Sequence, residues 1–192
     1  MRNHPEEASP QAPATPPPAV APGGLGLRAW SRDLFVSLTV SLFIILFLYQ
    51  PVRVEGTSML PRLEDQDRLF INKFAYRFEA IHPGDVVVFY YPHDHSKSYI
   101  KRVIALPGDS LSIEHGMVSV NGIVLKEPYV PEKYEDDRSL PTRVIPQGEY
   151  FVMGDHRSIS SDSRDFGPVP RDLIYGRAAV VYWPLDQAGV VR

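Results

Sequence analysis

The feature that most constrains this chain is residues 34–52, LFVSLTVSLFIILFLYQPV, a run of 19 residues without a charged side chain. As a helix with a rise of about 1.5 Å per residue, the run would reach roughly 28 Å, close to the thickness of a bilayer's hydrocarbon core. Its hydroxyl side chains are compatible with lipid, because a helical Ser or Thr can bond back to a carbonyl of the preceding turn. The run therefore predicts a transmembrane helix.

Two other interpretations of this run fit less well. A cleaved signal peptide has a shorter apolar core and an A-x-A-like site close behind it, and no such site follows here. A helix buried in a soluble core is disfavoured by the apolar surface on all sides of the run and by its position beside a low-complexity tail.

The flanks of the run predict its orientation. Arg28 and Arg32 precede it and Arg53 follows it, while Trp30 and Tyr49 lie near its ends, where aromatic belts occur. An excess of positive charge marks the cytoplasmic side, so we expect a single pass with the N-terminus in the cytoplasm.

Three parts of the chain follow from this orientation. Residues 1–27 are a Pro- and Ala-rich run that buries too little apolar surface to fold, so we expect a disordered cytoplasmic tail. Residues 28–52 are expected to be the transmembrane anchor, and residues 53–192 an extracytoplasmic domain.

The sequence pattern changes after residue 53, where short runs rich in Val, Ile, Phe and Tyr alternate with Gly, Pro, Asp and Asn. The pair Asn121-Gly122 between two apolar runs is a strong hairpin signal. The fold is expected to be mainly β, with antiparallel sheets that form a partly open, barrel-like domain or pack on each other. The predicted strands are 67–74, 85–92, 99–106, 110–114, 117–125, 148–155 and 176–183.

Composition excludes some classes of function. The 192 residues carry a net charge of −3, so nothing indicates nucleic acid as a partner. The chain has no cysteine, which excludes disulfides, cysteine nucleophiles and thiolate metal sites and fits an exported domain. His93 and His95 lie in a polar stretch that lacks a third ligand, so no metal site is expected there. The acidic stretch 133–138 is expected to be a solvated loop.

The segment 55–62, EGTSMLPR, raises the question of a nucleophile, because a serine hydroxyl needs a neighbouring base to attack a carbonyl. His156 beside Asp155 is one candidate base for Ser58. Lys101 is another, since burial in a strand would lower its pKa from about 10.4. On pattern alone, a strand lysine more often reaches to water from the sheet surface.

Several segments together resemble bacterial type I signal peptidases, the Ser-Lys proteases that remove signal peptides. The matching segments are SMLPRL (58–63), KRVIALPGD (101–109), GDHRSISSDSR (154–164) and, with them, GDVVVFYYP (84–92). They stand in the family's order behind an apolar segment, and the resemblance runs from about residue 30 to about residue 185.

The resemblance implies a role for each matched residue. Ser58 matches the nucleophile, Lys101 the general base, and Ser160 the serine that orients the lysine. Two charged pairs near the site are implied to be structural, Arg102 with Asp155 and Asp162 with Arg164. No metal or cofactor is implied.

One departure from the family pattern concerns the oxyanion hole. Many members have a serine hydroxyl two positions before the nucleophile, where this chain has Gly56. The hole is therefore expected to consist of backbone N–H groups at Ser58 and Gly56. His156 also replaces the asparagine that is usual in its box. The resemblance suggests substrate-pocket residues that plain core packing would equally explain: Val54, Met59, Leu63, Tyr99 and Ile100.

The expected function is that of a membrane-bound serine endopeptidase that removes N-terminal signal peptides from exported preproteins, cutting after small-x-small residues. Expected partners are preproteins and the lipid bilayer, near the secretion translocon, at the bacterial cytoplasmic membrane. Three rivals stay open: a self-cleaving protease of the SOS-repressor kind, a membrane-anchored β domain that only binds, and a His-dependent serine hydrolase. Residues 110–153 are expected to add one or two hairpins.

Overall fold

The computed structural model describes residues 27–191, so the tail predicted for residues 1–27 lies almost wholly outside the described residues. The chain divides into two compact units between Val40 and Ser41, a boundary that lies inside helix α1 (Leu27–Leu48). Many large apolar side chains of this helix are exposed, among them Phe35, Leu38 and Phe43. By length and apolarity, no helix within the described part of the chain qualifies as a membrane span.

The apolar run 34–52 is not helical to its end. Helix α1 stops at Leu48, and the chain continues as strand β1 (Tyr49–Arg53), which pairs with β2 (Arg68–Asn72). Pro51 lacks a backbone N–H and cannot continue a helix, but an edge strand tolerates it. β1 is such an edge strand, and the ring of Tyr49 lies edge-on to Phe70 across the pair. The expected helix is therefore four residues shorter at this end.

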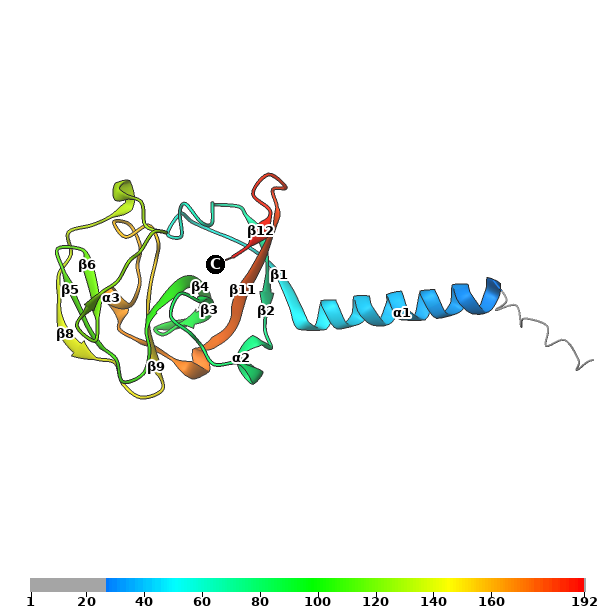
Figure 1. Cartoon of the computed structure of the whole chain (residues 1–192), viewed down its shortest axis with the longest axis horizontal. Helices are drawn as coiled ribbons and strands as arrows, with labels where there is room; N and C mark the ends of the chain where they lie inside the picture. Colours follow the sequence, from blue (N-terminus) through cyan, green and yellow to red (C-terminus); the bar gives the residue numbers. More distant parts are fainter. Residues whose placement is uncertain (1–26, 192) are drawn as a thin grey trace, which may run out of the picture. The chain divides into compact units, whose positions relative to one another are not determined.

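The rest of the domain is built mainly from strands (Figure 1). The strands that follow β2 are β3 (Val86–Tyr91), β4 (Asp94–Ala105), β5 (Ser110–Glu114), β6 (Met117–Val120), β7 (Ile123–Val124), β8 (Leu140–Val144), β9 (Glu149–Met153), β10 (Val169–Pro170), β11 (Ile174–Trp183) and β12 (Gly189–Val190). Short helical turns connect them: α2 (Ala75–Phe78), η1 (Glu132–Tyr134), α3 (Ser163–Phe166) and η2 (Arg171–Leu173).

The larger sheet has the strand order β1-β2-β11-β3-β4-β9-β10, and β12 pairs with β11. Every pairing in it is antiparallel, which confirms the expected mainly β architecture with antiparallel sheets. Within the described residues the path does not return from β10 to β1, so the sheet is not a closed barrel. β4 lies in the interior of the path: its residues up to Arg102 pair with β3, and its residues from Arg102 to Ala105 pair with β9.

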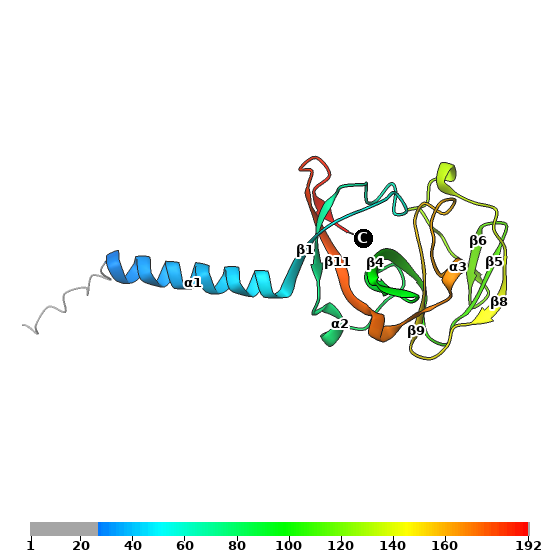
Figure 2. The same cartoon turned by 180° about the vertical axis from the view of Figure 1, so that it is seen from behind.

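The smaller sheet has the order β7-β6-β5-β8, and both views show β5, β6 and β8 together at the end of the domain away from β1 and β2 (Figures 1 and 2). Asn121 and Gly122 join β6 to β7 with φ values of 53° and 78°, the left-handed backbone that an Asn-Gly hairpin turn requires. The extra hairpins expected between residues 110 and 153 are these strands.

Three apolar clusters hold the domain together. One contains Val54, Met59 and Leu63 with residues of β2 and β11, and Ile100 packs against it. A second lies around Phe89 and Val103 with Tyr99 at its margin, and a third joins β5 and β6 to β9. Strand β4 contributes to all three clusters. Ile100 packs against the first, Tyr99 and Val103 belong to the second, and Ile104 belongs to the third.

Candidate active site

Ser58 lies in the loop between β1 and β2. Backbone hydrogen bonds hold the two ends of this loop together, and a buried side chain holds its middle. The base is closed by two backbone bonds, Val54 N–H to the Asp67 carbonyl at 2.8 Å and Gln66 N–H to the Val54 carbonyl at 2.9 Å. Met59, directly after Ser58, is 2% exposed and anchors the loop in the core. Ser58 itself stays partly exposed, so its hydroxyl is both held in place and accessible.

Lys101 reaches this hydroxyl from strand β4. Its Nζ lies 2.5 Å from Oγ of Ser58, although 43 positions separate the two residues. The lysine is only 4% exposed, and its Nζ lies 5.5 Å from the ring centroid of Tyr99. The alternative of a strand lysine reaching to water therefore does not describe this side chain.

Burial changes the acidity of Lys101. Desolvation lowers its pKa from 10.5 to about 8, because a buried ammonium loses its hydration. The carboxylates of Asp162 and Asp155 act in the opposite direction, while Arg164 lowers the pKa further. With a pKa of about 8, roughly a tenth of the amine is neutral at pH 7 and can accept a proton.

The segment 154–164 packs against the Ser58 loop. The N–H of His156 donates to the carbonyl of Ser58 at 3.0 Å. Gly154 has no room for a side chain, since a Cβ there would overlap Oγ of Ser160 and the carbonyl oxygen of Ser58. Ser160 is 2% exposed, and no described group meets its hydroxyl in hydrogen-bond geometry, although the hydroxyl is close enough to help lower the pKa of Asp162. The geometry thus places Ser160 beside the site without a bond to Lys101.

Two arginine–carboxylate forks flank the dyad. Arg102 donates through Nε and Nη2 to Asp155 at 2.8 and 2.6 Å, and the side chains of both residues are at most 2% exposed. Arg164 holds Asp162 in the same way, with both distances at 2.8 Å. Burial alone would raise the pKa of Asp162, but Arg164 and the N–H of Gly154 together lower it. Both carboxylates are thereby held in fixed positions near Lys101.

The structure places the two expected oxyanion donors differently. The N–H of Gly56, at a φ of 94°, donates to Oδ1 of Asp65 at 2.8 Å and is not directed toward an oxyanion. The inclusion of Gly56 in the hole is therefore not supported by this backbone geometry. No backbone partner is found for the N–H of Ser58 among the described residues, so this N–H remains a candidate donor.

The five expected pocket residues fall into two groups. Val54, Met59 and Leu63 are at most 5% exposed and lie inside a core cluster. Tyr99 and Ile100 are half-buried and keep some surface. Any pocket at this position is consequently shallow, because its floor is already packed.

His156 is placed to support backbone rather than to act on Ser58. Its Nδ1 lies 3.2 Å from the carbonyl oxygen of Thr57, and its ring packs on Tyr134 with 4.1 Å between centroids. The partner of the Ser58 hydroxyl within the described chain is Lys101.

His93 and His95 lie at the β3–β4 turn, with His95 inside β4 rather than in a longer loop. No group of potential metal ligands occurs in the part of the chain that the structure describes.

Comparison with known families agrees with this geometry. The model of the family "Signal peptidase, peptidase S26" matches residues 27–183. The chain belongs to this signal peptidase family. It is therefore a serine peptidase, as the resemblance of its segments implied.

Two relatives point the same way, one from Synechocystis sp. and one from Bacillus licheniformis. A probable signal peptidase I-1 of Synechocystis sp. is 37% identical over 165 residues, covering 81% of this chain and 82% of the relative. A signal peptidase I of Bacillus licheniformis is 32% identical, covering 84% of this chain and 91% of the relative. A crystal structure of a signal peptidase I from Enterococcus faecalis aligns with a TM-score of 0.47 and 30% identity, over 53% of this chain and 98% of that one.

Three residues in and around the candidate site were missed by sequence reasoning. Glu127 pairs with the buried Arg157, and no spacing signal links the two positions. Asp136 belongs to the acidic stretch that we expected to be a solvated loop, but its side chain is 11% exposed and binds Arg164 at 2.6 Å. That expectation was wrong for Asp136, because a charge run does not reveal which of its members meets a buried arginine. Gly154 belongs to the matched segment 154–164. A glycine directly before Asp155 was the available signal that the backbone there leaves no room for a side chain.

Proposed function

We propose that the protein removes N-terminal signal peptides from exported preproteins, with Ser58 as nucleophile and Lys101 as general base. The observation that carries the proposal is the 2.5 Å separation between the Ser58 hydroxyl and a lysine that is only 4% exposed and has a pKa of about 8. A nucleophile within hydrogen-bond reach of a base whose pKa is near the working pH is the arrangement that acyl transfer needs.

The reaction proceeds in two halves. Neutral Lys101 takes the proton of Ser58 while Oγ attacks the scissile carbonyl, and the N–H of Ser58 donates to the oxyanion. The intermediate collapses as the Lys101 ammonium protonates the leaving amine, which is the new N-terminus of the mature protein. Water then loses a proton to Lys101 and attacks the ester, and the signal peptide leaves as a carboxylate while Ser58 regains its proton.

Small residues at the first and third positions before the cut suit this site. Val54, Met59 and Leu63 are packed in the core, so a pocket beside Ser58 has little depth. The half-buried Tyr99 and Ile100 supply the remaining apolar surface. An extended substrate places alternate side chains toward such a surface, which favours a small-x-small pattern.

We place the reaction at the outer face of the bacterial cytoplasmic membrane, near the translocon. The support is the sequence: residues 34–52 carry no charge, and Arg28 and Arg32 precede them. In this arrangement, residues 1–27 are cytoplasmic, residues 28–52 anchor the chain and residues 53–192 form the peptidase domain. Among residues 27–191 no helix is long and apolar enough to span a membrane, so the anchor is proposed from the sequence alone.

Cleavage of a purified preprotein in detergent tests the proposal. Sequencing the N-terminus of the product should show one cut after a small-x-small site. Moving a Leu into the first position before the cut should abolish cleavage there, because the packed floor of the pocket does not accommodate it. Equal cleavage of the Leu-containing preprotein would contradict the specificity, and an uncut wild-type preprotein would contradict the function.

The pH dependence of kcat/KM should report the titration of Lys101. Since the neutral amine is the active form and its pKa is about 8, kcat/KM should rise about tenfold between pH 7 and pH 9 and then level off. Initial rates of preprotein cleavage across this range measure the midpoint. A profile that levels off by pH 6 would show that a group other than Lys101 is the base.

The rival mechanism with a histidine base makes a different forecast for His156. We expect His156→Ala to lower kcat/KM by less than about tenfold, because the ring contacts Thr57 and Tyr134 rather than the Ser58 hydroxyl. The same preprotein assay measures this change. A loss of a thousandfold or more with the fold intact would favour the rival.

A further inference from the structure

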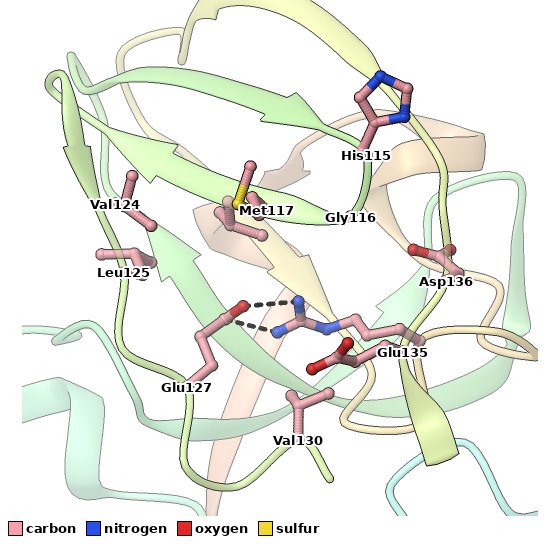
Figure 3. Close-up of a pocket in the computed structure, with 11 residues that line it drawn as sticks. His115, Gly116, Met117, Val124, Leu125, Glu127, Val130, Glu135 and Asp136 are labelled. Carbon is pink, nitrogen blue, oxygen red and sulfur yellow. Dashed lines mark hydrogen bonds and ion pairs between the residues drawn. The ribbon is translucent and has the colours of Figure 1, made fainter. Parts of the chain in front are cut away.

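A third arginine–carboxylate pair joins the matched segment 154–164 to a residue outside all the matched segments. Glu127 follows β7 and accepts two bonds from Arg157, with Nη1–Oε2 at 2.7 Å and Nη2–Oε1 at 2.5 Å. The Arg157 side chain is 3% exposed and that of Glu127 is 12% exposed. Glu127 lines a cavity of about 180 Å³. Figure 3 shows its carboxylate joined to the guanidinium group by dashed lines.

Tyr129 strengthens this pair and extends it to Arg102. Its hydroxyl donates to Oε1 of Glu127 at 2.8 Å, and the Arg102 guanidinium stacks 4.1 Å from its ring centroid. Burial, followed by the Glu127 charge, raises the pKa of Tyr129, so the hydroxyl keeps its proton and remains a donor. The turn at Glu127 is itself closed by a backbone bond from the Val130 N–H to the Glu127 carbonyl.

Arg157 transmits the position of Glu127 to the site. Its Nε donates to the Gly154 carbonyl at 3.0 Å, and its own carbonyl accepts from Nη2 of Arg164 at 2.9 Å. Gly154 is the residue that touches both Ser58 and Ser160 without room for a Cβ. A shift of the Arg157 side chain therefore moves backbone that packs directly against the nucleophile.

We propose that Glu127, supported by Tyr129, is a positioning residue that holds Arg157 and Gly154 so that Ser58 meets Lys101. This inference deepens the proposed function and depends on it. Removal of the Glu127 carboxylate leaves a buried guanidinium without its partner, and Arg157 must then move or take up water. The loop 154–164 loosens as a result.

The action of Glu127 on Lys101 is geometric rather than electrostatic. The charges that shift the pKa of Lys101 are those of Asp162, Asp155 and Arg164, and Glu127 is not among them. Loosening of the loop admits water to Lys101 and weakens the desolvation that lowers its pKa. If Glu127 is a positioning residue, its substitution should therefore raise the pH midpoint of kcat/KM. If Glu127 made only a remote structural contact, its substitution would leave the pH midpoint unchanged.

Glu127→Gln in the full chain tests the inference on a purified preprotein. We expect kcat to fall about 10- to 100-fold, KM to stay within about twofold, and the pH midpoint to rise by about half a unit or more. Glu135→Gln is the matched control, since Glu135 lines the same cavity and is exposed, and it should behave as wild type. A folded Glu127→Gln variant with wild-type kcat and pH midpoint would overturn the inference.

Tyr129→Phe decides the matter if Glu127→Gln does not fold. It removes one donor to Glu127 and keeps the ring under Arg102, so it should lower kcat about two- to fivefold and raise the pH midpoint in the same direction. An unchanged profile in this variant would overturn the inference. If the wild type cleaves the preprotein and both variants keep its kcat and pH midpoint, the positioning role alone is contradicted. If the wild type does not cleave the preprotein, the proposed function is contradicted, and this inference with it.

Discussion

Lys101→Ala should lower kcat/KM for preprotein cleavage by at least about 10⁴-fold. The substitution removes the group 2.5 Å from the Ser58 hydroxyl, and the hydroxyl has no other base within the described residues. An unactivated serine is a weak nucleophile, and the leaving amine would also lack its proton donor. The rate of product formation in detergent, followed by gel or mass spectrometry, measures the loss.

Lys97→Ala is the matched control for this change. Lys97 lies on the same strand, but its side chain is 62% exposed and pairs with Asp94 at 3.1 Å on the surface. The variant should cleave at the wild-type rate, because an exposed ion pair contributes little. If Lys101→Ala keeps more than about a tenth of the wild-type rate while folded, the lysine is not the general base.

Asp155→Ala should destabilise the domain by about 3–5 kcal/mol. Asp155 accepts both arms of the Arg102 fork at 2.8 and 2.6 Å, and the two side chains are 0% and 2% exposed. Without the carboxylate, a guanidinium stays in the core with only the Gly84 carbonyl and the Tyr129 ring as partners. Thermal or urea unfolding of the purified protein in detergent measures the change in the free energy of unfolding.

The comparison for Asp155 is an exposed pair of the same kind. Glu79 meets Arg177 at 3.0 Å, with side chains 54% and 32% exposed. Glu79→Ala should cost at most about 1 kcal/mol, since water screens this pair. Equal losses for Asp155→Ala and Glu79→Ala would show that burial of the Arg102 fork does not determine its contribution.

Much of the fold was predictable because its signals are local. Short runs rich in Val, Ile, Phe and Tyr indicated β2, β3 and β9, and the Asn-Gly turn indicated the β6–β7 hairpin. The end of helix α1 was misjudged because apolarity alone does not separate a helix from an edge strand, although Pro51 was the available signal. Strands such as β8 and β12 are short and lack a clear alternation, so tertiary pairing defines them.

The site was predictable only in its matched segments. The matched segments indicated Ser58 and Lys101, but no local rule gives the distance between the Ser58 loop and strand β4, which meet there. The hydrogen bond from the Gly56 N–H to the Asp65 side chain was not predictable, because the two residues lie nine positions apart and the sequence between them carries no local signal for this contact. Glu127 and Asp136 meet their arginines across 30 and 28 positions, so only the folded chain brings them together.

The most direct test of the central claim is the initial rate of preprotein cleavage by Ser58→Ala beside wild type, with the product N-terminus sequenced. Ser58 carries the hydroxyl that bonds to Lys101 in the described structure, so the variant should form no product above the uncatalysed background while it keeps the wild-type unfolding temperature. A folded Ser58→Ala protein that releases the same mature N-terminus at a comparable rate would contradict the Ser58–Lys101 mechanism.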